Sequence, residues 1–590
     1  MVNDPILTYK LNRDRYANTL RKIQKYLFWI GLLRLAIFSA TLFLVYYYLT
    51  SHYLMLLSGI IGTFIFFIVF FISLNLKHRE RKLTELVKLN DIEINALHGN
   101  FILLDSGHEF SDLMHFYSND IDLFGKDSFF QSINRTCTIA GKLHLSNLIN
   151  KNNEKGIEHR QEIIKELSTK VTWRQNFSTT ANLVKNTTPI LLTLKWIQNH
   201  QALLPKHILK IVLVFSSFTI SIFFGIFFDY LIFSHLVVWI FVGLGISSLF
   251  VSKVNKIYDN SSKSRVNIEL YYKLLEMIEN ETYHSRILIS MQEKLRRNNK
   301  NASLIFQKFS KALDALDQRN NLLFAFIGNS LFLWDLWQAY KIEKWILSYK
   351  HYVSECFEIV SFFDAQNSLA NFAFNHPNYT FPEITDTDTV IHAKDLGHPL
   401  LDIEKRITND CLINSKTITI VTGSNMAGKS TFLRTVSLSI VMANIGLPVC
   451  ASEMKYSPVK LITSMRTVDS LAKDTSYFFS ELKRLKLIVE ALQQEHYFVV
   501  LDEILKGTNS IDKAEGSKQF LEKLLLLNTT GLIATHDLSL CTLTDKYEQI
   551  QNAYFDGDIL EDELHFDYKL KQGISKNRNA SFLLKNMKIV

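Results

Sequence analysis

A glycine-rich stretch near residue 425 carries the residues best suited to phosphate chemistry. Residues 422–431 read Thr-Gly-Ser-Asn-Met-Ala-Gly-Lys-Ser-Thr, which fits the pattern G-x-x-x-x-G-K-S. An apolar β-branched run precedes the stretch and a helical apolar pattern follows it, which is the setting that this motif requires. Backbone N–H groups and the positive end of the next helix would hold the phosphates of ATP. The expected ATP contacts are Gly423, Ser424, Asn425, Met426, Ala427, Gly428, Lys429, Ser430 and Thr431.

Two side chains of this loop and two carboxylates downstream would carry the reaction. Lys429 would neutralise charge on the β- and γ-phosphates, and Ser430 would bind Mg²⁺. Residues 496–501 form an apolar strand that ends in Asp502 and Glu503. Asp502 would hold Mg²⁺ directly or through water, and Glu503 would orient or deprotonate the attacking water. Such a run is common in proteins, but after a phosphate loop it predicts a nucleotide triphosphatase.

Two further positions have an alternative interpretation that the residues alone leave open. His536 ends another apolar strand, where it could contact the γ-phosphate or its water, or could simply make a structural hydrogen bond. Ser476 enters a helix with apolar positions at Phe478, Leu482 and Leu485. It could bind an anion at the helix N-terminus, but an ordinary N-cap is the favoured interpretation from the residues alone.

The composition indicates a large protein with membrane segments. The chain has 590 residues, 47% hydrophobic and 21% charged, with 43 phenylalanines. This length predicts more than one domain. The net charge of +8 is modest and does not by itself indicate nucleic-acid binding, because much of the basic excess flanks apolar runs. The five cysteines are scattered without a C-x-x-C pair, which argues against a disulfide framework or a zinc site.

Four apolar runs fall into two pairs with very short polar links, so each pair predicts a helical hairpin. The runs cover residues 35–49, 53–76, 211–228 and 231–251, and the first extends back to Leu27 if Arg34 is tolerated. The last three approach or exceed the roughly 20 residues that cross a bilayer as a helix. Arg34 could reach toward a membrane surface. The alternative is that these are buried core helices of a large soluble protein.

Basic residues flank both hairpins on the same side. Under the positive-inside rule this pattern places both termini and the nucleotide domain in the cytoplasm, beneath an inner or cytoplasmic membrane that four helices cross. A cleaved signal peptide is not expected, because no small-residue cleavage site follows the first run. The flanking residues are Lys10, Arg13, Arg15, Arg21, Lys22, Lys25, Lys77, Arg79, Arg81, Lys82, Lys206, Lys210, Lys253, Lys256, Lys263 and Arg265.

The predicted fold is an α/β P-loop domain at the C-terminus, preceded by a helical region that contains the two transmembrane hairpins. Hydrophobic periodicity changes from helical to mixed near Pro377, Pro382 and Pro399. The predicted segments are a basic lead (1–26), the first hairpin (27–76), a helical connector (77–120), a helical region (121–207), the second hairpin (208–251), a helical core or lever region (252–389) and the nucleotide domain (390–590).

The motifs together resemble the MutS family. Residues 422–431 resemble the family's T-G-P-N-M-x-G-K-S-T, with the Asn-Met pair as the distinguishing part. Residues 502–510 are similar to its D-E-x-x-x-G-T-[SN] segment, 534–536 to its A-T-H strand, 476–482 to its S-T-F-x-x-E-M, and 397–399 to its R-H-P. Upstream, residues 123–145 and 157–167 resemble the start of the MutS core domain.

The resemblance implies roles that the residues alone do not. In this family two nucleotide domains pair head to tail, so it implies a dimer, here a homodimer, with composite ATP sites. Ser476 would then reach the γ-phosphate of the partner, in place of the N-cap role favoured above. His536 would be the switch residue, and Asn425 would touch the phosphates or the attacking water. ATP, Mg²⁺ and DNA are the implied ligands.

The chain also departs from the family pattern. The space before the core, where the mismatch-reading domain lies, holds a membrane hairpin and no convincing Phe-x-Glu wedge. The second hairpin falls where the family's lever and clamp helices would run, so the clamp is expected to be either replaced or greatly shortened. Residues 406–409 offer no aromatic to stack adenine. The best basic cluster, which is more simply a solvated helix end or loop than a DNA contact, is Lys294, Arg296, Arg297 and Lys300.

Three functions follow, in this order. The first is a membrane-anchored MutS-family ATPase in which ATP binding closes the dimer, hydrolysis releases it, and the family implies binding of mismatched or branched DNA in repair. The second is a mechanochemical ATPase that acts on the hairpins or an envelope partner without DNA. The third is a transporter-like role, for which two hairpins per chain are few.

Overall fold

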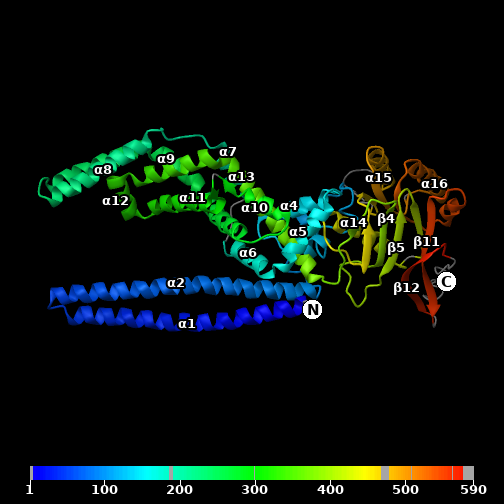
Figure 1. Cartoon of the computed structure of the whole chain (residues 1–590), viewed down its shortest axis with the longest axis horizontal. Coiled ribbons are helices and arrows are strands. Elements are labelled where there is room, and N and C mark those ends of the chain that lie inside the picture. The colour runs from blue at the N-terminus through cyan, green and yellow to red at the C-terminus, as the bar shows by residue number, and fades with distance from the viewer. Residues whose placement is uncertain are drawn as a thin grey trace.

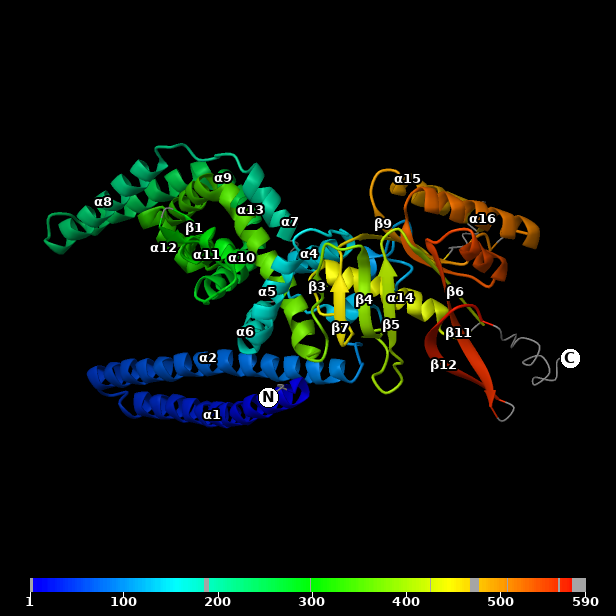
Figure 2. The same ribbon diagram turned by 45° about the vertical axis from the view of Figure 1, so that its right-hand side comes forward.

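The computed structural model describes residues 4–184, 190–297, 299–424, 426–466, 477–506, 508–560 and 563–575. Helices make up the N-terminal part and an α/β arrangement makes up the C-terminal part, as Figure 1 shows along the long axis of the molecule. Two helical hairpins project from the helical part in the same direction, away from the α/β part, and Figure 2 shows the same arrangement after rotation.

The first hairpin consists of α1 (Pro5–Tyr47) and α2 (His52–Leu97), so the predicted basic lead continues directly into the first apolar helix. Pro5 opens α1 and Asp4 caps it, with the Ile6 backbone N–H donating to Asp4 Oδ1 at 2.9 Å. Arg34 lies within the apolar half of the hairpin. Its guanidinium sits over the rings of two α2 residues, 5.3 Å from the Phe66 centroid and 5.1 Å from the Phe70 centroid.

The second hairpin consists of α8 (Ile208–Phe227) and α9 (Phe233–Glu279). A short apolar helix that was not predicted as a separate element, α12 (Leu322–Phe332), packs against both. Gly243 allows this close approach, because a Cβ at this position would lie 2.1 Å from the carbonyl oxygen of Ser330. Thr219 of α8 joins the three helices: it accepts from Trp239 Nε1 and donates to the Leu331 carbonyl, both at 2.8 Å.

The connector over residues 77–120 is helical only in its first part. Helix α2 ends at Leu97, and residues 98–128 contain one 3₁₀ turn, η1 (His108–Phe110). Gly99 and Gly107 adopt φ values of 78° and 62°, which side chains rarely adopt and which end the helical path. Asp105 and Asp112 then make local side-chain turns with backbone N–H groups two residues on.

The long helix α13 joins the second hairpin to the α/β part. It runs from Trp334 to Asn375, and its last three turns are buried against α4 and α5. The other elements of the helical part are α3 (Phe129–Ile133), α4 (Ile139–Asn150), α5 (Ile157–Thr169), α6 (Val171–Leu183), α7 (Ile190–Asn199), α10 (Arg286–Glu293), β1 (Arg296–Arg297), β2 (Lys300–Asn301), α11 (Ala302–Asp317) and η2 (Gln318–Asn320).

Two sheets build the α/β part. A six-stranded sheet has the order β12-β11-β6-β10-β9-β8, and a four-stranded sheet has the order β3-β7-β4-β5. Strands β11, β6, β10, β9 and β8 run parallel. The strands are β3 (Glu383–Ile384), β4 (Thr389–Leu396), β5 (Asn409–Asn414), β6 (Ile418–Gly423), β7 (Glu453–Tyr456), β8 (Lys460–Ser464), β9 (Tyr497–Asp502), β10 (Thr530–Ala534), β11 (Ile550–Leu560) and β12 (Glu563–Gln572).

Helices cover both faces of the six-stranded sheet. The nearly fully buried helix α14 (Lys429–Asn444) shares a core with strands of both sheets. A second core on the opposite face includes residues of α15 (Tyr477–Leu492), α16 (Ser510–Leu526) and η4 (Leu538–Asp545). The parallel strands therefore end at one common edge, where polar residues after each strand can meet.

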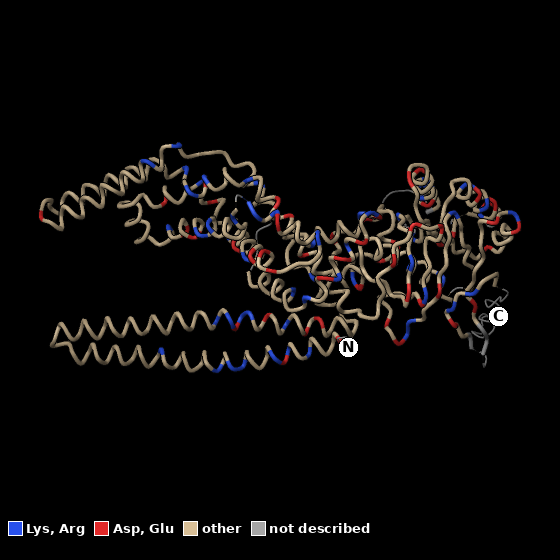
Figure 3. Tube along the Cα trace, viewed as in Figure 1, with Lys and Arg blue, Asp and Glu red and all other residues tan. Residues whose placement is uncertain are grey.

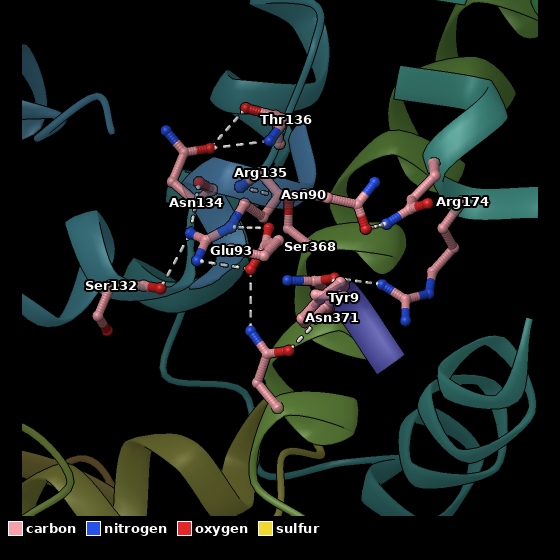
Figure 4. Close-up of polar contacts among 12 residues, drawn as sticks. Tyr9, Asn90, Glu93, Ser132, Asn134, Arg135, Thr136, Arg174, Ser368 and Asn371 are labelled. Carbon is pink, nitrogen blue, oxygen red and sulfur yellow. Dashed lines mark hydrogen bonds and ion pairs between the residues drawn. The ribbon is translucent and has the colours of Figure 1, made fainter. Parts of the chain in front are cut away.

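A buried polar cluster fastens the base of the first hairpin to the helical part (Figure 4). Glu93 of α2 pairs with Arg135, with Arg135 Nε 2.5 Å from Glu93 Oε1, and both side chains are nearly buried. Asn375 of α13 donates to the same carboxylate at 3.0 Å. The Tyr9 hydroxyl of α1 donates to Asn375 Oδ1 at 2.8 Å. Both hairpin helices are thus linked to the C-terminal end of α13.

Replacement of Glu93 by glutamine is expected to destabilise the protein by about 3 kcal/mol, because it leaves the buried Arg135 guanidinium without its counter-charge. The midpoint of thermal unfolding of the detergent-solubilised chain should fall by several degrees. Glu80→Gln is the matched control: this half-buried position of the same helix accepts from Gln24 Nε2 at 3.4 Å and pairs with no Lys or Arg among the described residues, so its replacement should leave the midpoint nearly unchanged. Equal midpoints for the two variants would contradict this role of the pair.

Candidate functional site

The glycine loop follows β6 and ends at the first residue of α14. Gly423 and Gly428 adopt φ values of 139° and 106°, in the region that favours glycine. A Cβ at Gly423 would lie 2.3 Å from the Phe555 carbonyl oxygen, so the β11 backbone also requires glycine there. Helix α14 has no side-chain cap at its N-terminus. Its first backbone N–H groups therefore remain available to an anion.

Lys429 lies almost fully buried beneath this loop. Its Nζ donates to the carbonyl oxygens of Gly423 and Ser424, at 2.8 and 2.9 Å, and lies 3.4 Å from His536 Nε2. Burial lowers the pKa of Lys429, and the nearby carboxylates of Asp502 and Glu503 oppose that shift. The Ser424 hydroxyl is buried without a partner among the described residues. The loop thus holds a cation against its carbonyl oxygens and keeps a buried hydroxyl without a partner among the described residues.

Asp502 and Glu503 stand at the end of β9, one strand beyond β10 from the loop. The Ser430 hydroxyl donates to Asp502 Oδ2 at 2.7 Å, so two oxygen atoms suited to Mg²⁺ already lie together. Glu503 adopts a left-handed backbone with φ 57°, and its N–H donates to the Ala534 carbonyl at 2.9 Å. This contact to β10 holds the strained residue with its carboxylate at the common edge.

His536 follows β10, which lies between β6 and β9 in the sheet. Its Nε2 is 3.4 Å from Lys429 Nζ and 3.7 Å from Glu503 Oε1, so it lies between the cation and the carboxylate. Burial lowers the pKa of His536, the charge of Lys429 lowers it further, and Glu503 and Asp502 oppose the shift. The imidazole is therefore neutral near pH 7 and can accept a hydrogen bond from Lys429 through Nε2.

Five of the predicted site residues lie together, as expected if they act in one site. They are Lys429, Ser430, Asp502, Glu503 and His536. Of the other expected contacts, Ala427 is fully buried, whereas Met426 is 82% exposed. Thr431 is exposed on the first turn of α14. Asn425 and Ser476 lie outside the described residues, so their predicted roles stay predictions.

Two residues at the site were missed in the sequence. Lys513, in the first turn of α16, places Nζ 3.9 Å from Glu503 Oε1. Tyr568 of β12 lies beside the loop, since a Cβ at Gly428 would sit 3.2 Å from its Cδ1. Asn409, in the segment expected to hold an aromatic, instead donates to the Tyr568 carbonyl at 3.0 Å. A lysine in a helix and one tyrosine in a strand give no local signal of such a position.

Glu481 of α15 supports the segment after Glu503. It is 3% exposed and accepts the Lys506 backbone N–H at 3.0 Å. Burial raises the pKa of Glu481, and the N–H groups of Leu505 and Lys506 oppose the shift. Helix α15, which is described from Tyr477 onward, is thus hydrogen-bonded to the segment that follows the two site carboxylates.

Comparisons with known proteins find relatives of the C-terminal part of the chain. Residues 419–586 match the family model "MutS domain V". The chain is 29% identical over 250 residues to mouse MutS protein homolog 4, which covers 40% of this chain and 26% of that protein. It is 32% identical over 242 residues to the DNA mismatch repair protein MutS of Finegoldia magna, covering 39% of this chain and 28% of that protein.

The chain is also similar to a plant protein. It is 31% identical over 220 residues to the DNA mismatch repair protein MSH4 of Arabidopsis thaliana. That match covers 35% of this chain and 27% of the relative. The chain thus spans about a quarter of the length of the curated relatives it matches. The matched model contains the glycine loop, both carboxylates and His536. The C-terminal domain of this chain is therefore a MutS domain V, similar to that of MutS-family proteins.

Proposed function

We propose that this chain is a membrane-anchored ATPase of the MutS family with a DNA-repair-related function. One observation carries the ATPase part: Lys429, Ser430, Asp502, Glu503 and His536 meet at the edge where β6, β9 and β10 end. This edge is where ligands bind in parallel α/β sheets. The arrangement supports a P-loop domain in which residues 423–431 surround the phosphates of ATP.

The residues fit an ATP–Mg²⁺ complex. The unpartnered Ser424 hydroxyl and the uncapped start of α14 offer donors to phosphate oxygens. Ser430 and Asp502 would hold Mg²⁺, which would supply charge neutralisation between the phosphates. Lys429 would exchange its bonds to the loop carbonyls for bonds to phosphate. The Tyr568 ring, 43% exposed beside the loop, offers a flat surface for the base.

Glu503 and His536 would act on the water. Glu503 is fixed at the edge by its backbone bond to β10 and would accept a proton from the attacking water. His536 would relay the loss of the γ-phosphate, because it lies between Lys429 and Glu503. In the proposed dimer, the segment around Ser476 of one chain would complete the site of the partner.

The depressed pKa of His536 predicts the pH dependence of ATP turnover. The residue is neutral near pH 7 and gains its proton only below its ordinary pKa of 6.5, where Nε2 no longer accepts from Lys429. We expect kcat to be flat near neutrality and to fall on an acidic limb that lies below pH 6.5. His536→Asn should lower kcat and remove this limb in a pH profile. A limb unchanged in the variant would assign it to another group.

The two hairpins support membrane insertion. Among the described residues, four helices are long and apolar enough to cross a bilayer, and none of the most apolar window of α1 or of α2 is buried inside the protein. In Figure 3 the outer halves of both hairpins are almost free of Lys, Arg, Asp and Glu, whereas charges gather at their bases. Since both hairpins point the same way, one bilayer could contain all four helices.

Helix α13 supplies a mechanical link between the nucleotide domain and the membrane. Its C-terminal turns bond to both helices of the first hairpin through Asn375 and Asn371. Its N-terminal end contacts α8, α9 and α12 of the second hairpin. Closing of two nucleotide domains around ATP would therefore move both hairpins together.

The proposed DNA binding rests on the relatives, two of which are named DNA mismatch repair proteins. A basic hairpin, β1–β2, exposes Arg296, Arg297 and Lys300, and none of these pairs with a carboxylate within the described part of the chain. Such a group could contact phosphates. The test is the binding of the reconstituted chain to duplex, mismatched and branched DNA at several salt concentrations, together with the ATPase rate on each DNA.

We expect binding that weakens steeply with salt and an ATPase rate that DNA stimulates. Arg296→Gln with Lys300→Gln should lower affinity for all DNAs and reduce the salt slope by about two. Lys308→Gln with Lys311→Gln, on α11, is the matched control for the charge change. If the chain hydrolyses ATP but binds no DNA at low salt, the proposed DNA binding is wrong. The mechanochemical alternative, in which the ATPase acts through the hairpins without DNA, then takes its place.

A further inference from the structure

A partly open cavity of about 280 Å³ lies between α9, η2, α12 and the start of α13. Its walls combine apolar side chains, among them Leu244, Val251 and Val254, with the polar side chains of Ser247, Asn329, Arg319 and Asp335. A cavity of mixed character beside a membrane hairpin is unusual, because charged groups at such depth are costly unless they pair or bind something.

The depth of the cavity follows from helix geometry. Ser247 lies 14 residues after Phe233, the first residue of α9, or roughly 21 Å along the axis. Lys253, the first lysine or arginine of α9, lies roughly 30 Å along it, which matches the thickness of the hydrocarbon core. In an inserted hairpin the cavity would therefore extend from within the hydrocarbon core, at Ser247, to its cytoplasmic boundary, at Val254, where phospholipid glycerol and headgroups begin.

Two charged groups in this cavity have atoms without partners. Arg319 Nε lies 3.4 Å from Asp335 Oδ2, and Arg319 Nη2 donates to Asn255 Oδ1 at 2.7 Å. Arg319 Nη1 and Asp335 Oδ1 are both buried and make no hydrogen bond to a described residue. Asp335 as a whole is only 9% exposed. Arg319 and Asp335, which both line the cavity, thus keep one buried cationic donor and one buried anionic acceptor without a partner among the described residues.

We infer that this cavity binds the headgroup of a zwitterionic phospholipid with a primary ammonium. Its phosphate would accept from Arg319 Nη1 and its ammonium would donate to Asp335 Oδ1, which satisfies both atoms. A purely anionic headgroup would leave Asp335 facing a like charge, and a quaternary ammonium has no N–H to donate. The acyl chains would run along α12, whose Leu322, Leu323 and Phe326 side chains are exposed.

This inference rests on the proposed membrane insertion, so the experiment has two arms. In the first, the full chain is reconstituted into vesicles and floated on a density gradient. In the second, delipidated protein in detergent takes up lipid from an equimolar mixture of phosphatidylethanolamine and phosphatidylglycerol, and retained lipid is counted by native mass spectrometry. We expect wild type to float with vesicles and to retain phosphatidylethanolamine about tenfold over phosphatidylglycerol.

Variants assign that preference to the cavity. Asp335→Asn should bring the ratio of retained lipids near unity, and Arg319→Gln should lower retention of both lipids. Ala325→Leu fills the cavity without removing a charge and should also abolish the preference, which covers the case in which a charge variant does not fold. Asp314→Asn is the matched control, since Asp314 pairs with Arg265 outside the cavity and should leave the ratio unchanged.

The two arms separate the failures. Wild type that floats with vesicles but retains both lipids equally overturns the headgroup site and leaves the membrane proposal standing. The same holds if Ala325→Leu and Asp335→Asn, once shown to be folded by thermal unfolding, both keep the wild-type ratio. Wild type that does not float overturns the membrane insertion and, with it, the site.

Discussion

Replacement of Lys429 by alanine is expected to abolish ATP turnover, with kcat/KM reduced by at least roughly 100-fold. Lys429 is the buried cation beneath the glycine loop. Its Nζ donates to two loop carbonyl oxygens, and phosphate oxygens would replace these acceptors when ATP binds. Without it, the negative charge of the phosphates would be held by backbone N–H groups alone. Both nucleotide affinity and turnover should therefore fall.

The measurement is phosphate release together with equilibrium binding of a fluorescent ATP analogue. Lys518→Ala, on an exposed position of α16 in the same domain, is the matched control for the loss of one lysine and should behave as wild type. Turnover by the Lys429 variant within a few-fold of wild type, with the protein folded, would mean that the loop does not hold the phosphates in the way described.

Replacement of Glu503 by glutamine is expected to give a different defect, in which ATP binds normally but is not hydrolysed. Glutamine keeps the size and one acceptor oxygen but cannot take a proton, so kcat should fall roughly 10²- to 10³-fold. Lys429, Ser430 and Asp502 remain in place, and binding should persist. The variant should thus accumulate bound, uncleaved ATP, which chromatography of the extracted nucleotide would detect.

A control is provided by Glu515→Gln, an exposed position on α16 that makes the same chemical change away from the edge of the sheet. Equal turnover in wild type and the Glu503 variant would refute the role of this carboxylate. Loss of both binding and turnover would instead point to a structural role, since the Glu503 backbone is held by its bond to Ala534.

The features that could be predicted from the sequence are those with strong local signals. Strands β6, β9 and β10 are continuous apolar runs, and each ends in the polar residues that meet at the site. The two helical hairpins are evident from length and hydropathy alone, and their four helices lie where the four apolar runs predicted them. Their insertion into a bilayer stays a prediction.

Other features depend on tertiary contacts and could not be predicted. Glu93 and Arg135 are 42 residues apart, and nothing local marks them as a pair. Helix α12 has only 11 residues, too few to cross a bilayer, so its apolar sequence could equally indicate a buried core helix. Tyr568 reaches the glycine loop only because β12 closes the edge of the six-stranded sheet beside β11.

The most direct test of a membrane-anchored ATPase is to reconstitute the full chain into sealed vesicles, separate the vesicles by flotation and measure ATP hydrolysis in each fraction. The account predicts that Mg²⁺-dependent ATPase activity floats with the vesicles, resists extraction by high salt, and is lost when Glu503→Gln replaces wild type. Activity that stays at the bottom of the gradient would contradict the membrane insertion. Floated wild-type protein that hydrolyses no ATP, or that hydrolyses ATP no faster than the Glu503 variant, would contradict the proposed ATPase site.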